Sequence, residues 1–262
     1  MSAVHVRVDR RSAGDWIAWI TIQNEAKLNT LNSALMDDFA TAIGLLAADE
    51  LLRAAVITGA GEKAFCGGAD IDEMAGLNAA TAEAFITRLH HCCQALRDLP
   101  VPVIGRVQGY ALGAGLELLA SCDLRVAAQS AVFGMPEVKL GIPSVVEAAL
   151  LPGLVGWGRA RQILLLGENF SAIDAEAWGL VEKLVPLEEL DATVERWVDS
   201  ILKAGPLAVR QQKKLIREWE DLSMREAVLA GIPAFVQAQA SDEPSRRMRE
   251  FRRARFRPTA AE

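Results

Sequence analysis

The chain has 262 residues, of which 51% are hydrophobic and 24% charged, enough to bury a large core with a smaller second part. A net charge of −6 disfavours general binding of nucleic acid. No apolar run approaches the roughly 18 residues that a membrane span needs, and the first residues lack the apolar stretch of a secretion signal. The four cysteines form no CxxC motif and indicate reduced thiols. We expect a soluble, cytoplasmic protein without a membrane or nucleic-acid partner.

The N-terminal segments show two clear periodicities. Residues 4–8 and 16–22 alternate at period two, which predicts two strands of a hairpin. A helix is expected next, capped by Asn32 or Ser33. Its buried face should carry five apolar side chains at helical spacing: Leu35, Met36, Phe39, Ile43 and Leu46.

The rest of the chain changes character near residue 185. Before that point, strands are predicted over residues 54–58, 102–107, 124–127, 131–133 and 180–185, with helices over residues 79–99, 154–166 and 171–179. Beyond Pro186 only helices are predicted, over residues 187–204, 206–220, 223–240 and 244–256. This order predicts an α/β core, residues 1–190, followed by an all-helical region, residues 191–262.

Residues 90–93, inside one predicted helix, read His-His-Cys-Cys. Neighbouring helical residues point in different directions, so only His90 and Cys93 share a face. No further ligand set accompanies them in the sequence, and we therefore predict packing rather than a metal site.

A glycine-rich stretch, residues 109–123, is the centre around which the chain is organised. Gly113-Ala114-Gly115 has almost no side chain, so its backbone can approach a ligand closely. A short buried helix is expected from Leu116, and its first N–H groups would suit an oxygen that becomes negative during a reaction. Glu117 lies within one turn of those donors. The other interpretation is a tight strand-to-helix turn with a hydrogen-bonded glutamate. The stretch does not fit the GxGxxG dinucleotide pattern.

Two more stretches carry candidate functional groups. Residues 67–69, Gly-Gly-Ala, again have bare backbone, and Asp70 after them is suited to close a turn. Glu137 follows Pro136 among apolar neighbours, where the pKa of a carboxyl rises towards that of a general acid. An exposed loop glutamate is the alternative. Residues 144–147, Ser-Val-Val-Glu, have the pattern of a capping box, so Glu147 is assigned first to helix capping and second to chemistry.

The C-terminal helices are rich in apolar and basic residues. Their apolar positions are too numerous for a solvated appendage and predict an interface, with Leu215, Ile216, Trp219, Leu222, Val228 and Leu229 as examples. Residues 246–257 hold seven arginines. Nucleic acid is one interpretation of this basic tail, but intersubunit ion pairs or a phosphorylated ligand fit an acidic protein better.

In residues 65–74, 109–118 and 133–137 the chain resembles the enoyl-CoA hydratase/isomerase (crotonase) family, and residues 27–31 match the N-terminal loop of that family. The resemblance covers nearly the whole chain. It implies a spiral of ββα units with a C-terminal helical trimerisation region, often assembled as a hexamer. It also implies a coenzyme A thioester as substrate, with no separate cofactor and no metal. The thioester oxygen would lie between the N–H groups of Ala69 and Ala114. Contacts to coenzyme A would come from Ala26, Lys27, Leu28, Gly68, Asp70, Ile71 and Gly113.

Glu117 and Glu137 match the two glutamates of family members that hydrate enoyl thioesters. Adding water needs a base for the water and an acid for C2, whereas a double-bond isomerase needs one proton carrier, normally at position 137. We therefore predict an enoyl-CoA hydratase or, in reverse, a dehydratase. The same-class alternatives are isomerisation, thioester hydrolysis and decarboxylation, and a non-catalytic, RNA-binding protein is the alternative from another class.

The chain departs from the family pattern at two places. Residues 142–150 replace a glycine-rich run after the second glutamate, which puts Ser144 beside the water site and Glu147 nearby. In the tail, Met248 and Phe251 fall where an aromatic residue and a lysine often cover the nucleotide of a neighbouring subunit's ligand. Arg249, Arg252 and Arg253 are candidate substitutes.

Overall fold

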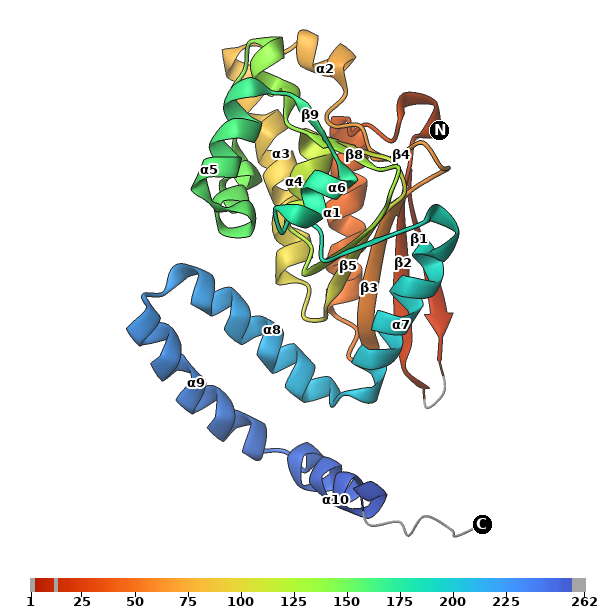
Figure 1. Cartoon of the computed structure of the whole chain (residues 1–262), viewed down its shortest axis with the longest axis vertical. Coiled ribbons are helices and arrows are strands. Elements are labelled where there is room, and N and C mark those ends of the chain that lie inside the picture. Colours follow the sequence, from red (N-terminus) through yellow and green to blue (C-terminus); the bar gives the residue numbers. More distant parts are fainter. Residues whose placement is uncertain (1–2, 12–13, 256–262) are drawn as a thin grey trace. The chain divides into compact units, whose positions relative to one another are not determined.

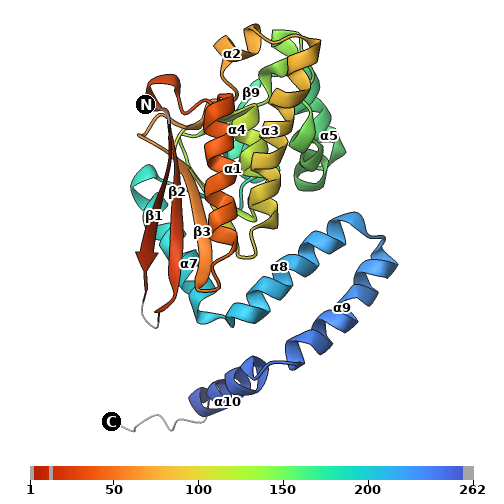
Figure 2. The ribbon, with the colours of Figure 1, turned by 180° about the vertical axis from the view of Figure 1, so that it is seen from behind.

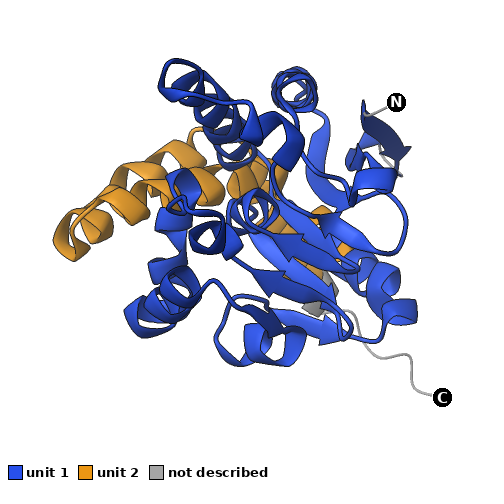
Figure 3. Cartoon of the chain, turned by 90° about the horizontal axis from the view of Figure 1, so that it is seen from above, with its two compact units in different colours: residues 1–198 blue, residues 199–262 orange. Residues whose placement is uncertain are grey.

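The computed structural model describes residues 3–11 and 14–255, the latter with side chains to residue 253 (Figure 1). The chain divides into two compact units, Met1–Val198 and Asp199–Glu262, which Figure 3 colours separately. The boundary falls inside helix α7 (Leu190–Lys203), eight residues after the division expected from the sequence at residue 190.

The large sheet of unit 1 has six strands in the order β1-β2-β3-β5-β7-β10. Their bounds are β1 Ala3–Arg10, β2 Trp16–Gln23, β3 Leu52–Gly59, β5 Val103–Val107, β7 Leu124–Ala128 and β10 Lys183–Val185. β1 and β2 pair antiparallel, which confirms the predicted hairpin, and the other neighbours pair in parallel. All eight residues of β3 are buried, as expected of a parallel strand covered on both faces.

A second sheet has the order β4-β6-β8-β9, with bounds Ala64–Cys66, Tyr110–Leu112, Val132–Gly134 and Asn169–Ser171. β4, β6 and β8 are parallel neighbours. Each of them directly follows a strand of the large sheet, and a helical segment comes next in the chain. This repetition is the predicted spiral of ββα units. It also brings the carboxyl ends of three strands to one edge, and all three candidate segments start there.

Two long helices, α1 (Ser33–Ala47) and α3 (Ala79–Asp98), pack side by side next to the large sheet (Figure 2). Asn32 caps α1 by accepting a hydrogen bond from the N–H of Leu35 at 2.8 Å. The five side chains predicted for its inner face are all buried, so the period of the apolar residues identified this face correctly.

Further elements complete unit 1. They are η2 (Glu25–Lys27), α2 (Ile71–Ala75), α4 (Ala114–Ala120), η3 (Pro136–Leu140), η4 (Val146–Leu150), α5 (Leu151–Leu166), α6 (Ala172–Ala177) and η5 (Leu187–Glu189), where η marks a 3-10 helix. α4 begins two residues earlier than predicted, because Gly113 turns the chain at a positive φ of 50°. The capping box predicted at Ser144 is wrong: η4 follows Val145, whose side chain makes no capping bond.

Unit 2 is helical, with α8 (Pro206–Asp221), α9 (Met224–Gln239) and α10 (Glu243–Arg255). The buried Glu243 of α10 accepts hydrogen bonds from the N–H groups of Leu207 and Ala208, which open α8. Many large apolar side chains of unit 2 are exposed in the single chain: Ile216, Trp219, Leu222, Met224, Val228, Leu229, Ile232, Phe235, Val236, Met248 and Phe251. In the part of the chain that the structure describes, no helix is long and apolar enough to cross a bilayer.

Candidate active site

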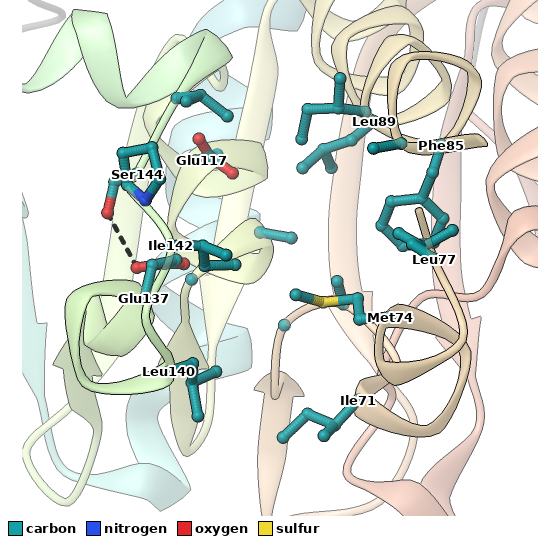
Figure 4. Close-up of a pocket in the computed structure, with 18 of the residues that line it drawn as sticks. Ile71, Met74, Leu77, Phe85, Leu89, Glu117, Glu137, Leu140, Ile142 and Ser144 are labelled. Carbon is teal, nitrogen blue, oxygen red and sulfur yellow. Dashed lines mark hydrogen bonds between the residues drawn. The ribbon is translucent and has the colours of Figure 1, made fainter. Parts of the chain in front are cut away.

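A pocket of about 610 Å³ lies at the edge where β4, β6 and β8 end. Both glycine-rich segments line it, together with the two candidate glutamates (Figure 4). Parallel pairing explains the convergence, because the carboxyl ends of neighbouring parallel strands meet at one edge of a sheet.

The first loop, residues 67–69, is held by the segment around Leu28 and Leu31. The N–H of Gly67 donates to the carbonyl of Leu28, and the N–H of Leu31 donates to the carbonyl of Gly68, both at 2.8 Å. Asp70 completes the bridge by donating its N–H to the carbonyl of Leu31. The bridge uses the carbonyl of Gly68 and the N–H of Asp70. The N–H of Ala69, between them, points away from Leu31 and takes no part in the bridge.

The second loop requires glycine at two positions. Gly113 has φ +50° and ψ −122°, a conformation that side chains disfavour. A Cβ on Gly115 would lie 2.2 Å from the carbonyl oxygen of Cys66, so α4 packs directly against the end of β4. Ala114 is the first residue of α4, where an N–H has no intrahelical acceptor.

These two loops bring the N–H groups of Ala69 and Ala114 to the same pocket. A Cβ on Gly68 would lie only 3.9 Å from the nitrogen of Ala114, which shows how closely the loops approach. Among residues 3–11 and 14–255, neither N–H has a hydrogen-bond partner. Two unpaired donors next to each other can bind an oxygen that gains negative charge.

Glu117 lies on α4 and is 4% exposed. Its Oε1 accepts a hydrogen bond from the N–H of Ala148 at 3.1 Å. Burial, followed by the charge of Glu137, raises the pKa of Glu117 to about 8, although the Ala148 bond opposes the shift. The interpretation of Glu117 as only a hydrogen-bonded turn residue does not account for its position in the pocket wall.

Glu137 lies on η3, directly after Pro136, and lines the same pocket. Its Oε2 accepts a hydrogen bond from the hydroxyl of Ser144 at 2.9 Å (Figure 4). A Cβ on Gly113 would lie 2.4 Å from its Oε1, so the missing side chain at position 113 gives the carboxyl its place. Burial raises the pKa of Glu137, against the hydrogen bonds from its own backbone and from Ser144.

Ser144 and Glu147 take roles that the capping-box prediction missed. The Ser144 hydroxyl donates to Glu137. Glu147 is 6% exposed, and its Oε1 lies 2.7 Å from Nδ1 of His90, within hydrogen-bond distance. Both partners come from other elements, and therefore a pattern local to residues 144–147 could not reveal them. The only sequence signal was the departure of this stretch from the family pattern.

The remaining pocket wall is mostly apolar. Figure 4 shows Ile71, Met74, Leu77, Phe85 and Leu89 across the pocket from the two glutamates, with Leu140 and Ile142 on the glutamates' side. Ile71 is 61% exposed, a large apolar side chain at the surface. This lining suits a hydrocarbon chain attached to a polar reacting group.

The residues expected to contact coenzyme A fall into two groups. Gly68, Ile71 and Gly113 line the pocket, whereas Ala26, Lys27 and Leu28 are exposed in and after η2, outside the lining. Asp70 joins the groups, because the Lys27 ammonium donates to its Oδ2 at 2.8 Å.

Lys27 also donates to Oδ2 of Asp72 at 2.9 Å. The hydrogen bonds with Asp70 and Asp72 raise the pKa of Lys27, and the same Lys27 bond lowers the pKa of Asp70. A phosphate group at Lys27 would therefore compete with two carboxylates for the ammonium.

The His-Cys cluster of α3 does not come together as one unit. Cys92 and Cys93 are buried free thiols, whereas His90 is half-buried and bonded to Glu147. Across residues 3–11 and 14–255, no three His, Cys, Asp or Glu side chains are arranged to hold a metal ion.

The tail residues singled out from the sequence lie on α10. Met248, Arg249, Phe251, Arg252 and Arg253 are all exposed in unit 2. Of the other tail arginines, Arg257 lies outside the described residues.

Residues 12–256 match the family described as Enoyl-CoA hydratase/isomerase. The short-chain-enoyl-CoA hydratase of Clostridium acetobutylicum is 35% identical over 236 residues, 90% of each chain. The crotonyl-CoA hydratase of Syntrophomonas wolfei is 35% identical over 244 residues, 92% of this chain and 94% of that one. The crystal structure of an enoyl-CoA hydratase from Bacillus anthracis has a TM-score of 0.89 at 31% identity and covers 95% of this chain and 96% of its own. With the fold and three convergent segments as described, the chain belongs to the enoyl-CoA hydratase/isomerase family.

Proposed function

We propose that this protein is an enoyl-CoA hydratase, which adds water across the 2,3 double bond of an enoyl-CoA thioester and catalyses the reverse dehydration. The observation that carries the proposal is that Glu117 and Glu137 line one pocket with the free N–H groups of Ala69 and Ala114. Relatives named short-chain-enoyl-CoA and crotonyl-CoA hydratases, at 35% identity over nine-tenths of the chain, support it.

Hydration needs one ionised and one protonated carboxyl. Glu117 takes a proton from water as the oxygen attacks C3, and Glu137 gives a proton to C2. Each hydration therefore ends with Glu117 protonated and with Glu137 ionised. This is the state from which dehydration starts. A pKa of about 8 for Glu117 favours this end state, so the proton must return to Glu137 before the next hydration.

The electron pair displaced from the double bond moves to the thioester oxygen. The N–H groups of Ala69 and Ala114 would hold that oxygen, and each such donor is typically worth about 2.7–4 kcal/mol on a transition state. Because these groups, two carboxyls and one water complete the reaction, we propose that no cofactor takes part and that coenzyme A belongs to the substrate. Lys27 and its neighbours Ala26 and Leu28 would contact the coenzyme A part.

We also propose a homotrimer or hexamer built through the helical region, in the cytoplasm. The exposed apolar side chains of α8, α9 and α10 support the assembly, and four buried free thiols support a reducing compartment. Light scattering at micromolar concentration should give three or six times the mass of the chain. A monomer would refute the assembly. Replacing Arg252 and Arg253 by alanine should raise KM for a coenzyme A thioester more than for a pantetheine thioester, if the tail contacts the nucleotide.

The function is tested by following the loss of conjugated absorbance of crotonyl-CoA with wild type, Glu117→Gln and Glu137→Gln. We expect both variants to lose about 10²–10⁴-fold in kcat, the usual worth of a proton-transferring side chain. Near-wild-type rates in both variants, on any enoyl-CoA that turns over, would refute the proposal. Dependence on Glu137 alone, with conversion of a 3-enoyl-CoA to the 2-enoyl form and no hydrated product, would instead identify an isomerase.

A further inference from the structure

His90 and Glu147 form a pair that takes no part in the proposed hydration steps. The Nδ1 of His90 on α3 lies 2.7 Å from Oε1 of Glu147 on η4. The histidine side chain is 46% exposed, whereas that of the glutamate is 7% exposed. The other oxygen of Glu147 is buried and has no hydrogen-bond partner among the described residues. A buried carboxyl oxygen without a hydrogen-bond partner destabilises the folded protein.

The segment that carries Glu147 also holds Glu117. The N–H of Ala148, the next residue, is shared between the carbonyl of Val145 at 2.9 Å and Oε1 of Glu117 at 3.1 Å. Val146, the preceding residue, has φ +40°, a left-handed conformation that is strained for a β-branched side chain. η4 is therefore a strained turn that two hydrogen bonds connect to neighbouring helices, one from Glu147 to His90 on α3 and one from Ala148 to Glu117 on α4.

The charges around Glu117 come from two elements. The charges of Glu137 on η3 and Glu147 on η4 both raise the pKa of Glu117. The thiol of Cys93 on α3 is also near, and that of Cys66 lies on β4 beneath α4. Burial raises the pKa of Cys66 to about 12 and that of Cys93 well above its usual value, so both thiols stay neutral. The charges that raise the pKa of Glu117 are those of the two carboxylates, of which Glu137 lines the pocket and Glu147 does not.

We infer that His90 and Glu147 are positioning residues for Glu117: their bond anchors η4 so that the Ala148 N–H stays on the Glu117 carboxyl, and the Glu147 charge favours the protonated form of Glu117. The inference rests on the proposed function for its kinetic consequences. It gives two separable effects, one from the anchor and one from the charge.

The anchor is tested by His90→Leu, which removes the bond to Glu147. We expect kcat for crotonyl-CoA to fall about 10-fold, with KM within about twofold of wild type, because Glu117 loses its alignment but the substrate contacts remain. His90→Asn places an amide N–H near the position of Nδ1 and should restore most of kcat. The matched control is His91→Leu, the same change at the exposed neighbour, which should leave both parameters unchanged.

The charge is tested by Glu147→Gln, which keeps an oxygen for the bond to His90 but removes the negative charge. Taking a like charge away lowers the pKa of Glu117, so the alkaline limb of kcat/KM should move to lower pH by about half a unit. A merely structural role would not move this limb. An unchanged limb together with unchanged kcat in His90→Leu would overturn the inference.

A second readout does not need activity. Glu117→Gln should change the pH dependence of the urea midpoint between pH 5 and 9, and the pH at which the change occurs reports the pKa of Glu117. That pH should be lower in the Glu147→Gln background than in wild type, and an equal pH would contradict the inference. If no enoyl-CoA thioester turns over, the proposed function fails, while this titration still decides the role of Glu147.

Discussion

Glu117 and Glu137 face one pocket from two unlike regions. Glu117 lies on α4, whose seven residues are all buried, whereas Glu137 lies on η3, whose five residues are half-buried or exposed. The carboxyl on α4 is held by a backbone N–H, that of Ala148, and the carboxyl on η3 by a side-chain hydroxyl, that of Ser144. Both pKa values are raised by burial first.

Because the surroundings of Glu117 and Glu137 differ, one pocket can hold two carboxyls in different protonation states. Nearly complete burial is the largest cause of the raised pKa of Glu117, and it favours the protonated form of this carboxyl. Around Glu137 the burial is weaker, and hydrogen bonds from its own backbone and from the Ser144 hydroxyl counteract the rise in its pKa. Changes near α4 should therefore alter stability and geometry strongly, and changes near η3 should tune the pH dependence.

The largest effect is expected from Glu117→Gln on stability. The folded pKa of about 8 exceeds the ordinary glutamate value of 4.5, so the folded wild type binds an extra proton between these pH values, and its stability falls as pH rises through the window. At about 1.4 kcal/mol per pH unit, the variant should gain about 3 kcal/mol relative to wild type between pH 5 and 8. Urea unfolding of both proteins at one concentration measures the gain. A constant difference across this range would mean that Glu117 is not held protonated.

A smaller effect is expected from Gly113→Ala. Gly113 lies where the two regions meet, because it directly precedes α4 and contacts the Glu137 carboxyl of η3. The new Cβ would lie 2.4 Å from Oε1 of Glu137 and would displace the carboxyl. We expect kcat/KM to fall about 100-fold, the cost of misplacing a catalytic group by about 1 Å. The control is Gly156→Ala, which shares a positive φ but whose Cβ meets no described atom within 4 Å. An equal loss in both variants would attribute the effect to backbone strain rather than to Glu137.

The local parts of this arrangement could be predicted from the sequence. The apolar period of α1, the cap at Asn32 and the two bare-backbone loops each depend on residues that are close in the chain. Pairing of β4, β6 and β8 then brings the loops together. The family resemblance predicted the oxyanion donors and the roles of the two glutamates, and these assignments stay predictions.

The partners of Ser144 and Glu147 could not be predicted in this way. His90 is 57 residues from Glu147, and the direction of the Ser144 hydroxyl depends on how residues 141–145 fold beside η3. A capping-box pattern describes one turn of chain, and here the contacts between elements override it. The start of α4 was missed by two residues because the conformation of Gly113 sets it.

The smallest effect is expected from Ser144→Ala, which acts on the η3 region alone. The Ser144 hydroxyl lowers the pKa of Glu137, so its loss should raise that pKa. The acid limb of kcat/KM should move to higher pH, with about a threefold loss in kcat. Ser144→Thr, which keeps the hydroxyl, should retain the wild-type profile. A shift of the alkaline limb instead would assign the hydroxyl to Glu117.

The central claim is that the two carboxyls together add the elements of water to an enoyl thioester. Mass spectrometry of the product formed from crotonyl-CoA in ¹⁸O-labelled water tests it most directly. We expect wild type to form a 3-hydroxybutyryl-CoA that carries one ¹⁸O at C3, and both Glu117→Gln and Glu137→Gln to lose this product. Free coenzyme A, a shifted double bond without ¹⁸O, or labelled product from either variant at the wild-type rate would contradict it.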